Sequence, residues 1–319
     1  MRKIYLLQFF LFCIIVHAQN ATEAKIYQNY PRGMQMFQTG YLLQTTNSTI
    51  DGNISLPKNT IDVNAHITYL RYAHFFNLGG KTTAVQVMLP YAIIDANFLG
   101  KDADQSGFGD LMIVLGGNIL GGESLPFKEF ITASRKTALA WSIAVNAPTG
   151  KYNEEHLLNP GNNRWQFKPE LGLSVPLGQW DLETYFGVKF FTDNTNNVHL
   201  NPKASSSTLS QKPFYGLTFH VGYNFNSSLW ASFDAASRYG GETSINQENQ
   251  NNAQTVLGLG GTITYSPSIH HQIGVSYMTN AEQNNYAPQG ALFNLKYSYV
   301  FGGQIRSTMK QLKQLQSIK

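Results

Sequence analysis

Apolar and polar residues alternate along this chain in stretches of about ten residues, the pattern of β-strands with two different faces. In residues 291–301, Phe293 and Leu295 share one face, while Asn294 and Lys296 share the other. The first face suits lipid and the second suits water. The sequence predicts twelve such strands, near residues 33–44, 61–72, 83–94, 108–119, 137–147, 163–175, 180–193, 215–224, 228–239, 255–265, 269–279 and 291–301. We therefore expect an all-β fold, a transmembrane antiparallel β-barrel of about 12 strands.

Charged residues fall on one parity of these strands, the side predicted to line the lumen. They carry both signs, so neighbouring strands can pair them with one another. One hypothesis is a wet pore wall whose charges satisfy each other, and the other is a constriction that binds solute. The candidate lumen-lining residues are Asp62, His66, Arg164, Lys168, Glu170, Asp181, Glu183, Lys189, His220, Asp234, Arg238 and Lys296. Twelve strands predict a narrow lumen, suited to small solutes.

The connections between the predicted strands alternate in length, as periplasmic turns and outer loops do in outer-membrane barrels. Short turns are expected near residues 77–81, 176–179, 225–227 and 266–268. Long polar loops are expected at 45–60, 95–107, 148–162, 194–212, 240–254 and 280–288. The connection 121–136 breaks the rule, because it is long yet falls on the periplasmic side. We expect a turn at 124–126 and an early start of the next strand, near Phe130.

Aromatic residues collect where the predicted strands cross the headgroup level of a membrane, as in the two girdles of a barrel. The expected periplasmic set is Trp180, Tyr223, Phe225, Tyr265, Tyr299 and Phe301, and the expected outer set is Trp165, Phe190, Tyr215 and Tyr277. A soluble β-protein could also bury aromatics in a core. A single soluble core would not order them by strand end.

The two ends of the chain differ from the barrel region. Residues 1–18 join a basic start to an apolar run and a small residue at Ala18, which predicts a signal peptide cut before Gln19. The chain's single cysteine, Cys13, lies in this leader. Residues 19–32 form a short periplasmic N-terminal segment that could lie in the mouth of the lumen, and 33–301 form the barrel. Residues 302–319 are a basic tail with an amphipathic helical pattern, either loosely ordered or docked as a helix.

The charge balance argues against a nucleic-acid partner. The chain has 23 basic and 19 acidic residues, but two basic residues lie in the leader and four in the tail. The body that remains has 17 basic against 19 acidic residues, so no basic patch is left to explain. Only 13% of residues are charged and a further 13% are aromatic, a balance that lipid-facing and water-facing strands produce.

Catalytic and metal motifs are missing from the sequence, so we expect no enzyme, no cofactor and no metal site. His270 and His271 are adjacent, but neighbouring strand residues point to opposite faces and rarely bind one ion. Some twelve-stranded barrels carry Ser-His chemistry on their lipid face. A barrel-embedded hydrolase therefore stays open as the less favoured alternative.

Three short motifs occur in a fixed order: Gly-Phe-Gly-Asp-Leu at 107–111, Pro-Thr-Gly-Lys-Tyr at 148–152, and Asn-Pro-Gly-Asn-Asn-Arg-Trp-Gln-Phe at 159–167. In these motifs and their order the chain resembles the outer-membrane barrel family labelled putative MetA-pathway of phenol degradation. The resemblance extends from about Met34 to Phe301 and implies a transporter-like barrel associated with aromatic or other hydrophobic compounds. It carries over no catalytic residues. The tail after Phe301 departs from the usual ending at a terminal aromatic. Asp110 in the first motif points inward by parity, with Arg164 and Lys168 as candidate partners.

The sequence thus predicts a channel of the bacterial outer membrane, for small solutes that include aromatic or hydrophobic ones, with passive passage through the lumen. Its expected partners are outer-membrane lipid, a small-molecule solute and the barrel-assembly machinery. A surface binding or adhesion barrel that acts through its outer loops is the main alternative. A purely structural barrel with a closed lumen also stays open.

Overall fold

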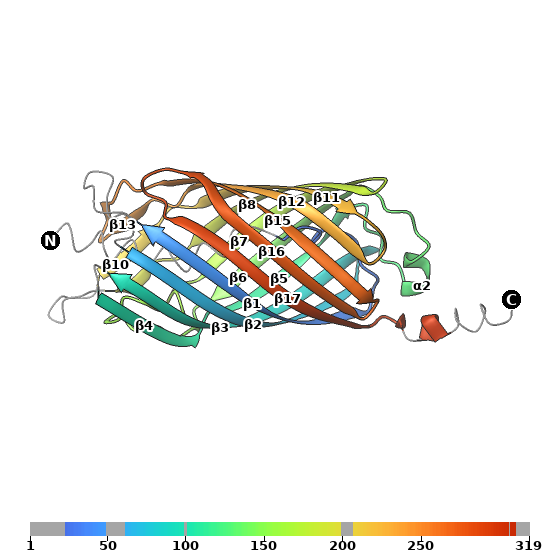
Figure 1. The fold of residues 1–319 in the computed structure, drawn as a ribbon, viewed down its shortest axis with the longest axis horizontal. Coiled ribbons are helices and arrows are strands. Elements are labelled where there is room, and N and C mark those ends of the chain that lie inside the picture. The colour runs from blue at the N-terminus through green and yellow to red at the C-terminus, as the bar shows by residue number, and fades with distance from the viewer. Residues whose placement is uncertain (1–22, 49–60, 99–100, 199–206, 306, 311–319) are drawn as a thin grey trace.

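The computed structural model describes residues 23–48, 61–98, 101–198, 207–305 and 307–310, and within them it is a barrel (Figure 1). The predicted signal peptide lies outside the described residues. Twelve strands close the barrel. They are β1 (Met34–Ser48), β2 (Ile61–Leu78), β3 (Lys81–Phe98), β5 (Leu111–Leu120), β6 (Ala138–Ala147), β7 (Gln166–Leu177), β8 (Trp180–Phe191), β11 (Phe214–Asn224), β12 (Leu229–Gly240), β15 (Gln254–Ser268), β16 (His271–Gln283) and β17 (Gln289–Gly302).

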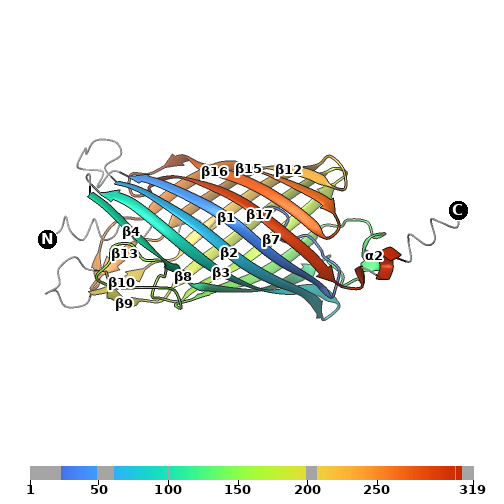
Figure 2. The same ribbon diagram turned by 60° about the horizontal axis from the view of Figure 1, so that its bottom comes forward.

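Every pair of neighbouring strands in the barrel is antiparallel. The first and last strands, β1 and β17, pair with each other and close the barrel at a seam. β1 pairs with β17 from Met34 opposite Gly302 to Asn47 opposite Gln289. Figure 2 shows β17, β1, β2 and β3 side by side and inclined to the long axis. Each of the twelve strands is thus paired on both sides, which is the condition for a sheet to cross a membrane. The predicted fold class is confirmed.

The segment predicted to be an outer loop, 95–107, is mostly strand in the structure, because β3 runs to Phe98 and a further strand, β4 (Lys101–Phe108), follows it. β4 and β5 both pair with β3, and they are separated by Gly109 and Asp110. The backbone N–H of Gly109 donates to the carbonyl of Pro90, 2.9 Å away, so the chain still contacts β3 at the break. A Cβ at Gly109 would lie 3.0 Å from Cγ of Pro90, which explains why glycine occupies this crowded position. The prediction of one strand at 108–119 missed this interruption.

The long connections at one end of the barrel build a second, smaller sheet. β9 (Asn194–Asn197), β10 (Ser207–Gln211), β13 (Thr243–Ile245) and β14 (Glu248–Asn249) form it, in the order β14-β13-β10-β9. Two more of the segments predicted to be long outer loops, 194–212 and 240–254, therefore contain strands. This sheet lies at the end of the barrel opposite α2 (Figure 1).

The long connection at the other end holds α2 (Phe127–Phe130), a single helical turn. An early strand start near Phe130 was wrong, because Phe130 is helical and β6 begins at Ala138. The cause is Pro126, which provides the N-terminal boundary of the turn and accepts hydrogen bonds from Glu129 and Phe130. Ser124 donates its N–H to Gly80, so the connection is fixed to the β2–β3 turn.

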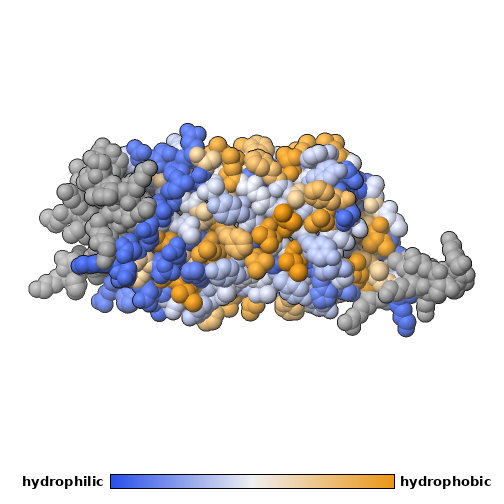
Figure 3. Space-filling model, viewed as in Figure 1, coloured by the Kyte–Doolittle hydropathy of each residue, from blue (hydrophilic) through white to orange (hydrophobic). Residues whose placement is uncertain are grey.

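The outer surface carries a band of apolar side chains, as Figure 3 shows over the middle of the barrel, with hydrophilic residues gathered at the loop end. Leucine, isoleucine, valine and phenylalanine side chains alternate outward along the strands, including Leu182, Phe186, Phe219 and Leu295. The predicted girdle residues that are exposed on this surface are Trp165, Trp180, Phe190, Tyr215, Phe225, Tyr265 and Tyr277. At the α2 end, Trp180, Tyr223 and Phe225 contact one another edge to face. An apolar band between aromatic girdles is the lipid-facing surface of a membrane barrel.

After β17 the chain turns through Gly302 and Gly303, both at positive φ. Residues 305 and 307–310 are helical, and Ile305 and Met309 pack on Met34, Phe75 and Phe127. The rest of the predicted amphipathic tail, 311–319, lies outside the described residues. Within the part of the chain that the structure describes, no helix is long and apolar enough to cross a membrane.

Candidate lumen site

The structure places ten of the twelve predicted lumen residues inside the barrel, buried or nearly so: Arg164, Lys168, Glu170, Asp181, Glu183, Lys189, His220, Asp234, Arg238 and Lys296. Most come from the neighbouring strands β7, β8, β11 and β12, while Lys296 stands apart on β17, which pairs with β1. Whether any of them contacts a solute stays a prediction.

Asp62 and His66 face the other way, which corrects the parity expected for β2. Val63, Ala65 and Tyr69 are buried on the inner face, while the side chain of His66 is 40% exposed. Nδ1 of His66 lies 2.6 Å from the Tyr41 hydroxyl, and Nε2 lies 3.5 Å from Asp95. The usual rule reverses here because the inner wall is apolar and the outward positions at the loop end are polar.

The described part of the N-terminal segment, Glu23–Arg32, enters the lumen and contacts the charged wall. Glu23 Oε2 accepts a hydrogen bond from Nζ of Lys296 at 2.6 Å and lies 4.0 Å from Arg71. Burial alone would raise the pKa of the Glu23 carboxyl, but Lys296 and Arg71 outweigh burial and hold that pKa at about 2. Glu23 is therefore an anion that ties the segment to the wall.

Lys25 binds this segment to the wall near the end of the barrel that carries α2. Its Nζ lies 3.0 Å from Asp181, donates to Asn224 at 2.5 Å and sits 4.4 Å above the Trp230 ring. Its backbone N–H donates to Glu183 at 2.7 Å. Oδ1 of Asp181 also lies 2.6 Å from Nη1 of Arg135. The Asp181 carboxylate therefore joins the N-terminal segment to the long connection before β6.

Tyr27 packs inside the lumen against the stretch of wall formed by β6, β7 and β8. Its hydroxyl donates to Glu170 at 2.7 Å and lies 2.6 Å from the Ser142 hydroxyl. Its ring packs edge to face on Tyr185, with 4.8 Å between centroids. Burial and the neighbouring Glu170 raise the pKa of Tyr27, so the phenol stays protonated and able to donate. The segment thus narrows the lumen without filling its apolar side.

Other charges on the inner wall are paired with each other, as the pore-wall hypothesis expects. Lys168 lies 2.6 Å from Glu170, and Nδ1 of His220 lies 2.7 Å from Asp234. Asp234 also accepts from the hydroxyls of Ser232 and Thr262.

The three sequence motifs meet at one point in the wall, around Asp110. Its Oδ1 accepts the N–H of Gly150 at 3.0 Å, and its Oδ2 accepts both the N–H and the side-chain amide of Asn162, at 2.9 and 2.8 Å. Asp110 thus accepts from Gly150 and Asn162 rather than from the expected donors Arg164 and Lys168. A Cβ at Gly150 would lie 2.7 Å from backbone atoms of Gly109 and Gly161, so only glycine allows the chains to approach this closely.

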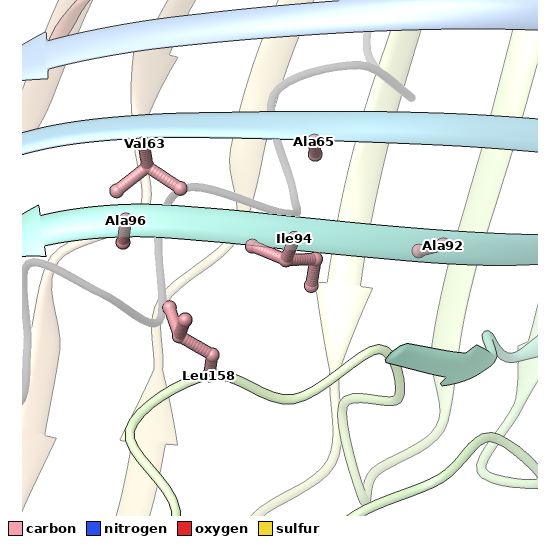
Figure 4. Packing of buried hydrophobic residues seen from close by; sticks show 6 residues of the cluster. All are labelled: Val63, Ala65, Ala92, Ile94, Ala96 and Leu158. Atoms are coloured by element: carbon pink, nitrogen blue, oxygen red, sulfur yellow. The ribbon is translucent and has the colours of Figure 1, made fainter. Parts of the chain in front are cut away.

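This junction folds the loop between β6 and β7 inward. Leu158 of that loop packs against the inner face of β2 and β3, where Figure 4 shows it beside Ile94 and Ala96. Val63, Ala65 and Ala92 complete the cluster. The loop therefore covers an apolar stretch of lumen wall.

An apolar cavity of about 190 Å³ lies between this loop and the N-terminal segment. Glu23 and Tyr27 bound it on one side, and Pro160, Asn162 and Asp110 on the other. Its wall comes from the inner faces of β1, β2, β3, β5 and β6, through Leu42, Ile67, Met88, Ala92, Met112 and Val114. Its other polar lining residues are Lys168, Glu170, Ser142 and Asn294, together with Tyr69, Arg71 and Gln86 from β2 and β3. A largely apolar cavity with a few polar groups is the usual form of a small-molecule site.

Sequence reasoning missed several residues of this site. The sequence analysis assigned the wrong face of β2 to the lumen, so it did not include Arg71 and Tyr69. It also assigned no contacts to Glu23 and Tyr27. The signal for Arg71 was the run of apolar residues at 63, 65 and 67, which shares its parity. Among the described residues, no group of three or more His, Cys, Asp or Glu is placed to hold a metal ion.

Comparison with solved structures finds the same fold in other bacterial barrels. An outer membrane channel from Pseudomonas putida F1 matches with TM-score 0.75 at 20% identity, over 88% of this chain and 100% of that one. The transport unit of the autotransporter AIDA-I from Escherichia coli matches with TM-score 0.52 at 11% identity, over 92% and 99%. The β domain of the Bordetella autotransporter BrkA matches with TM-score 0.50 at 11% identity, over 83% and 98%. These likenesses show the fold.

Comparison with curated proteins finds no match to the chain. The model of one protein family does match, across residues 45–297, which takes in ten complete barrel strands and all three motifs around Asp110. The chain therefore belongs to the family described as putative MetA-pathway of phenol degradation.

Proposed function

We propose that this barrel is a passive channel of the bacterial outer membrane for small apolar solutes, including compounds with a single aromatic ring. The observation that carries the proposal is the apolar cavity of about 190 Å³ in the lumen. An apolar cavity of about 150 Å³ is enough to bind benzene in another protein. A single ring therefore fits between Tyr27 and the inward-folded loop.

The split of the lumen supports the same function. Charged residues on β7, β8, β11, β12 and β17 are largely engaged with one another and with Glu23 and Lys25. The opposite wall offers Ile67, Met88 and Met112, which present apolar surface to a solute. A solute without charge would thus move along one wall and leave the ion pairs of the other intact. The family description and the channel from Pseudomonas putida F1 fit this proposal.

The proposal makes the barrel a conduit rather than an enzyme, with lipid around it and the barrel-assembly machinery needed to insert it. Ester or phospholipid hydrolysis by the purified protein would contradict this. A ligand on the cell surface bound only by the outer sheet, in a barrel that passes no solute, would favour the adhesion alternative.

Two adjacent residues on β3 give a matched test. Ala92 lines the cavity, whereas Ile93 is exposed on the lipid-facing side. Ala92→Trp should fill the cavity, and Ile93→Trp should leave it open. Single-channel recording in planar bilayers would measure how phenol interrupts the ionic current. Interruption in the wild type and in Ile93→Trp, but not in Ala92→Trp, is the expected result. Equal interruption in all three proteins would contradict the proposed solute site.

A further inference from the structure

A second, cationic cavity lies beside the apolar one. It measures about 90 Å³ and is lined by Lys168, Lys189 and Arg238. Four small residues on neighbouring strands, Gly187, Gly216, Ala236 and Gly258, hollow out the wall there. Gly187 and Gly216 are direct register partners, as are Ala236 and Gly258, so the missing side chains lie together.

Lys189 carries the argument for a ligand. Its side chain is 3% exposed, and its Nζ has no hydrogen-bond partner in the part of the chain that the structure describes. The Phe191 ring, 5.6 Å from Nζ, supplies a weak cation–π contact. A buried ammonium that lacks an acceptor is costly unless an anion joins it.

The neighbours of Lys189 increase the demand for negative charge. Arg164 stacks on the same Phe191 ring at 4.4 Å, and Arg238 lies over Phe214 at 4.9 Å. Of the acids near these basic groups, Glu170 binds Lys168 and Tyr27, and Asp110 accepts hydrogen bonds from Gly150 and Asn162. Arg164, Lys168 and Arg238 thus surround Lys189 with further positively charged groups.

The two cavities meet at Lys168, which lines both of them. The apolar cavity has room for a ring, and the cationic cavity is smaller, with room for an anionic group. Phe214, Val256 and Met278 give the rest of the cationic cavity an apolar lining. This combination fits a molecule with an apolar body and a single carboxylate.

We propose that the lumen binds small organic acids, with the carboxylate at Lys189 in the cationic cavity and the apolar body in the adjoining apolar cavity. The inference rests on the proposed function and extends its solutes to monocarboxylates with an apolar body. Nζ of Lys189 donates to the carboxylate, and Lys168 and Arg238 supply further positive charge beside it. A neutral molecule of the same shape lacks this contact.

Titration calorimetry on the folded barrel in detergent tests the inference without requiring conduction. Benzoate is the probe and benzamide is its neutral counterpart. Lys189→Gln removes the ammonium, and Gly216→Val fills the hollow. A Cβ at Gly216 would meet only backbone carbonyls at 3.8 and 3.9 Å, so this substitution fits the fold. Lys212→Gln is the matched control, because Lys212 pairs with Glu242 on the exposed surface.

Benzoate should bind the wild type and the control equally. Its Kd should rise at least about tenfold in both lumen variants, since an unpaired buried charge is a large loss. Benzamide should bind weakly and without regard to Lys189. Unchanged benzoate affinity in folded Lys189→Gln, or benzamide binding as tight as benzoate, would overturn the inference.

The mobility shift of the unboiled barrel in gels would verify folding, and Gly216→Val decides the question if Lys189→Gln does not fold. The experiments distinguish a failure of the proposed solute passage from a failure of the proposed acid binding. A barrel that conducts and is interrupted by phenol, yet binds no benzoate, loses only this inference. A barrel that binds benzoate in detergent but passes nothing loses only the proposed passage.

Discussion

Glu23 and Lys296 form an ion pair of 2.6 Å although they stand 273 positions apart in the chain. Lys296 belongs to the last strand, and Glu23 belongs to the segment that precedes the first. The pair therefore joins the contents of the lumen to its wall near the seam between β1 and β17. Lys296 is 9% exposed and Glu23 is 31% exposed, so water screens the contact only in part.

A double-mutant cycle with Glu23→Gln and Lys296→Met should measure this pair. We expect a coupling free energy of about 1 kcal/mol in denaturant unfolding, the usual order for a partly screened charged hydrogen bond. The single variant Glu23→Gln should also give a larger single-channel conductance, because the segment loses its tie to the wall. Additive free energies and an unchanged conductance would show that the pair does not hold the segment.

The acidity of Glu23 predicts when the segment is released. Its pKa of about 2 in the folded protein lies below the ordinary 4.5, so the ion pair contributes stability fully above pH 4.5 and loses it as the pH falls toward 2. Conductance should be the same at pH 7 and pH 5 and should rise below about pH 4. Glu23→Gln should lack this acid-dependent part of the rise. A transition at pH 5 to 7 that vanishes in the variant would contradict the assignment.

Tyr27 should control how wide the lumen is at its middle. Tyr27→Ala removes the ring that bounds the apolar cavity, so we expect a larger conductance and weaker interruption by phenol. Tyr27→Phe keeps the ring and loses only the contacts to Ser142 and Glu170, at a cost of about 1 to 2 kcal/mol in unfolding free energy. Recordings in which the two variants behave alike would show that the hydroxyl, rather than the ring, sets the width.

Asp110 should hold the inward loop in place. Asp110→Asn turns one acceptor oxygen into a donor that faces backbone N–H groups, so we expect the loop to loosen and trypsin to cut after Lys151. The loss should be about 2 kcal/mol, since hydrogen bonds to a charged group are stronger than neutral ones. Asp102→Asn is the control, because Asp102 lies on exposed β4, where it accepts a hydrogen bond from Asn97 of β3. Equal protection from trypsin in both variants would contradict this role.

The alternation of the sequence was enough to predict the barrel, because lipid and water demand opposite residues on the two faces of a strand. In β8, β11 and β17 every charged residue has the predicted orientation. In β2 the demand is reversed, since Leu158 gives the inner wall an apolar neighbour and the outward residues near Asp62 are polar. The alternation in β2 is clear, but there the apolar residues face the lumen. This orientation becomes visible only when the loop that carries Leu158 is seen to pack on the inner wall.

The interior of the lumen could not be predicted in the same way. Tyr27 contacts Ser142 and Glu170 across more than a hundred positions, and no local period encodes such contacts. Asp110 shows the same limit. Its inward direction was correctly predicted, but its partners include the backbone N–H groups of Gly150 and Asn162. Gly150 has no side chain that could have indicated such a contact in the sequence.

The seam between β1 and β17 has a kinetic consequence. β1 pairs with β2 on one side and with β17 on the other, and β17 is the last strand in the chain. The sheet can therefore close only after its last strand is present. Contacts of such sequence separation are slow to form. Until they do, β1 and β17 each present an unpaired edge, and Lys296 has not reached Glu23. The step that seals the wall is thus also the step that locks the N-terminal segment inside, and the lumen acquires its final width last.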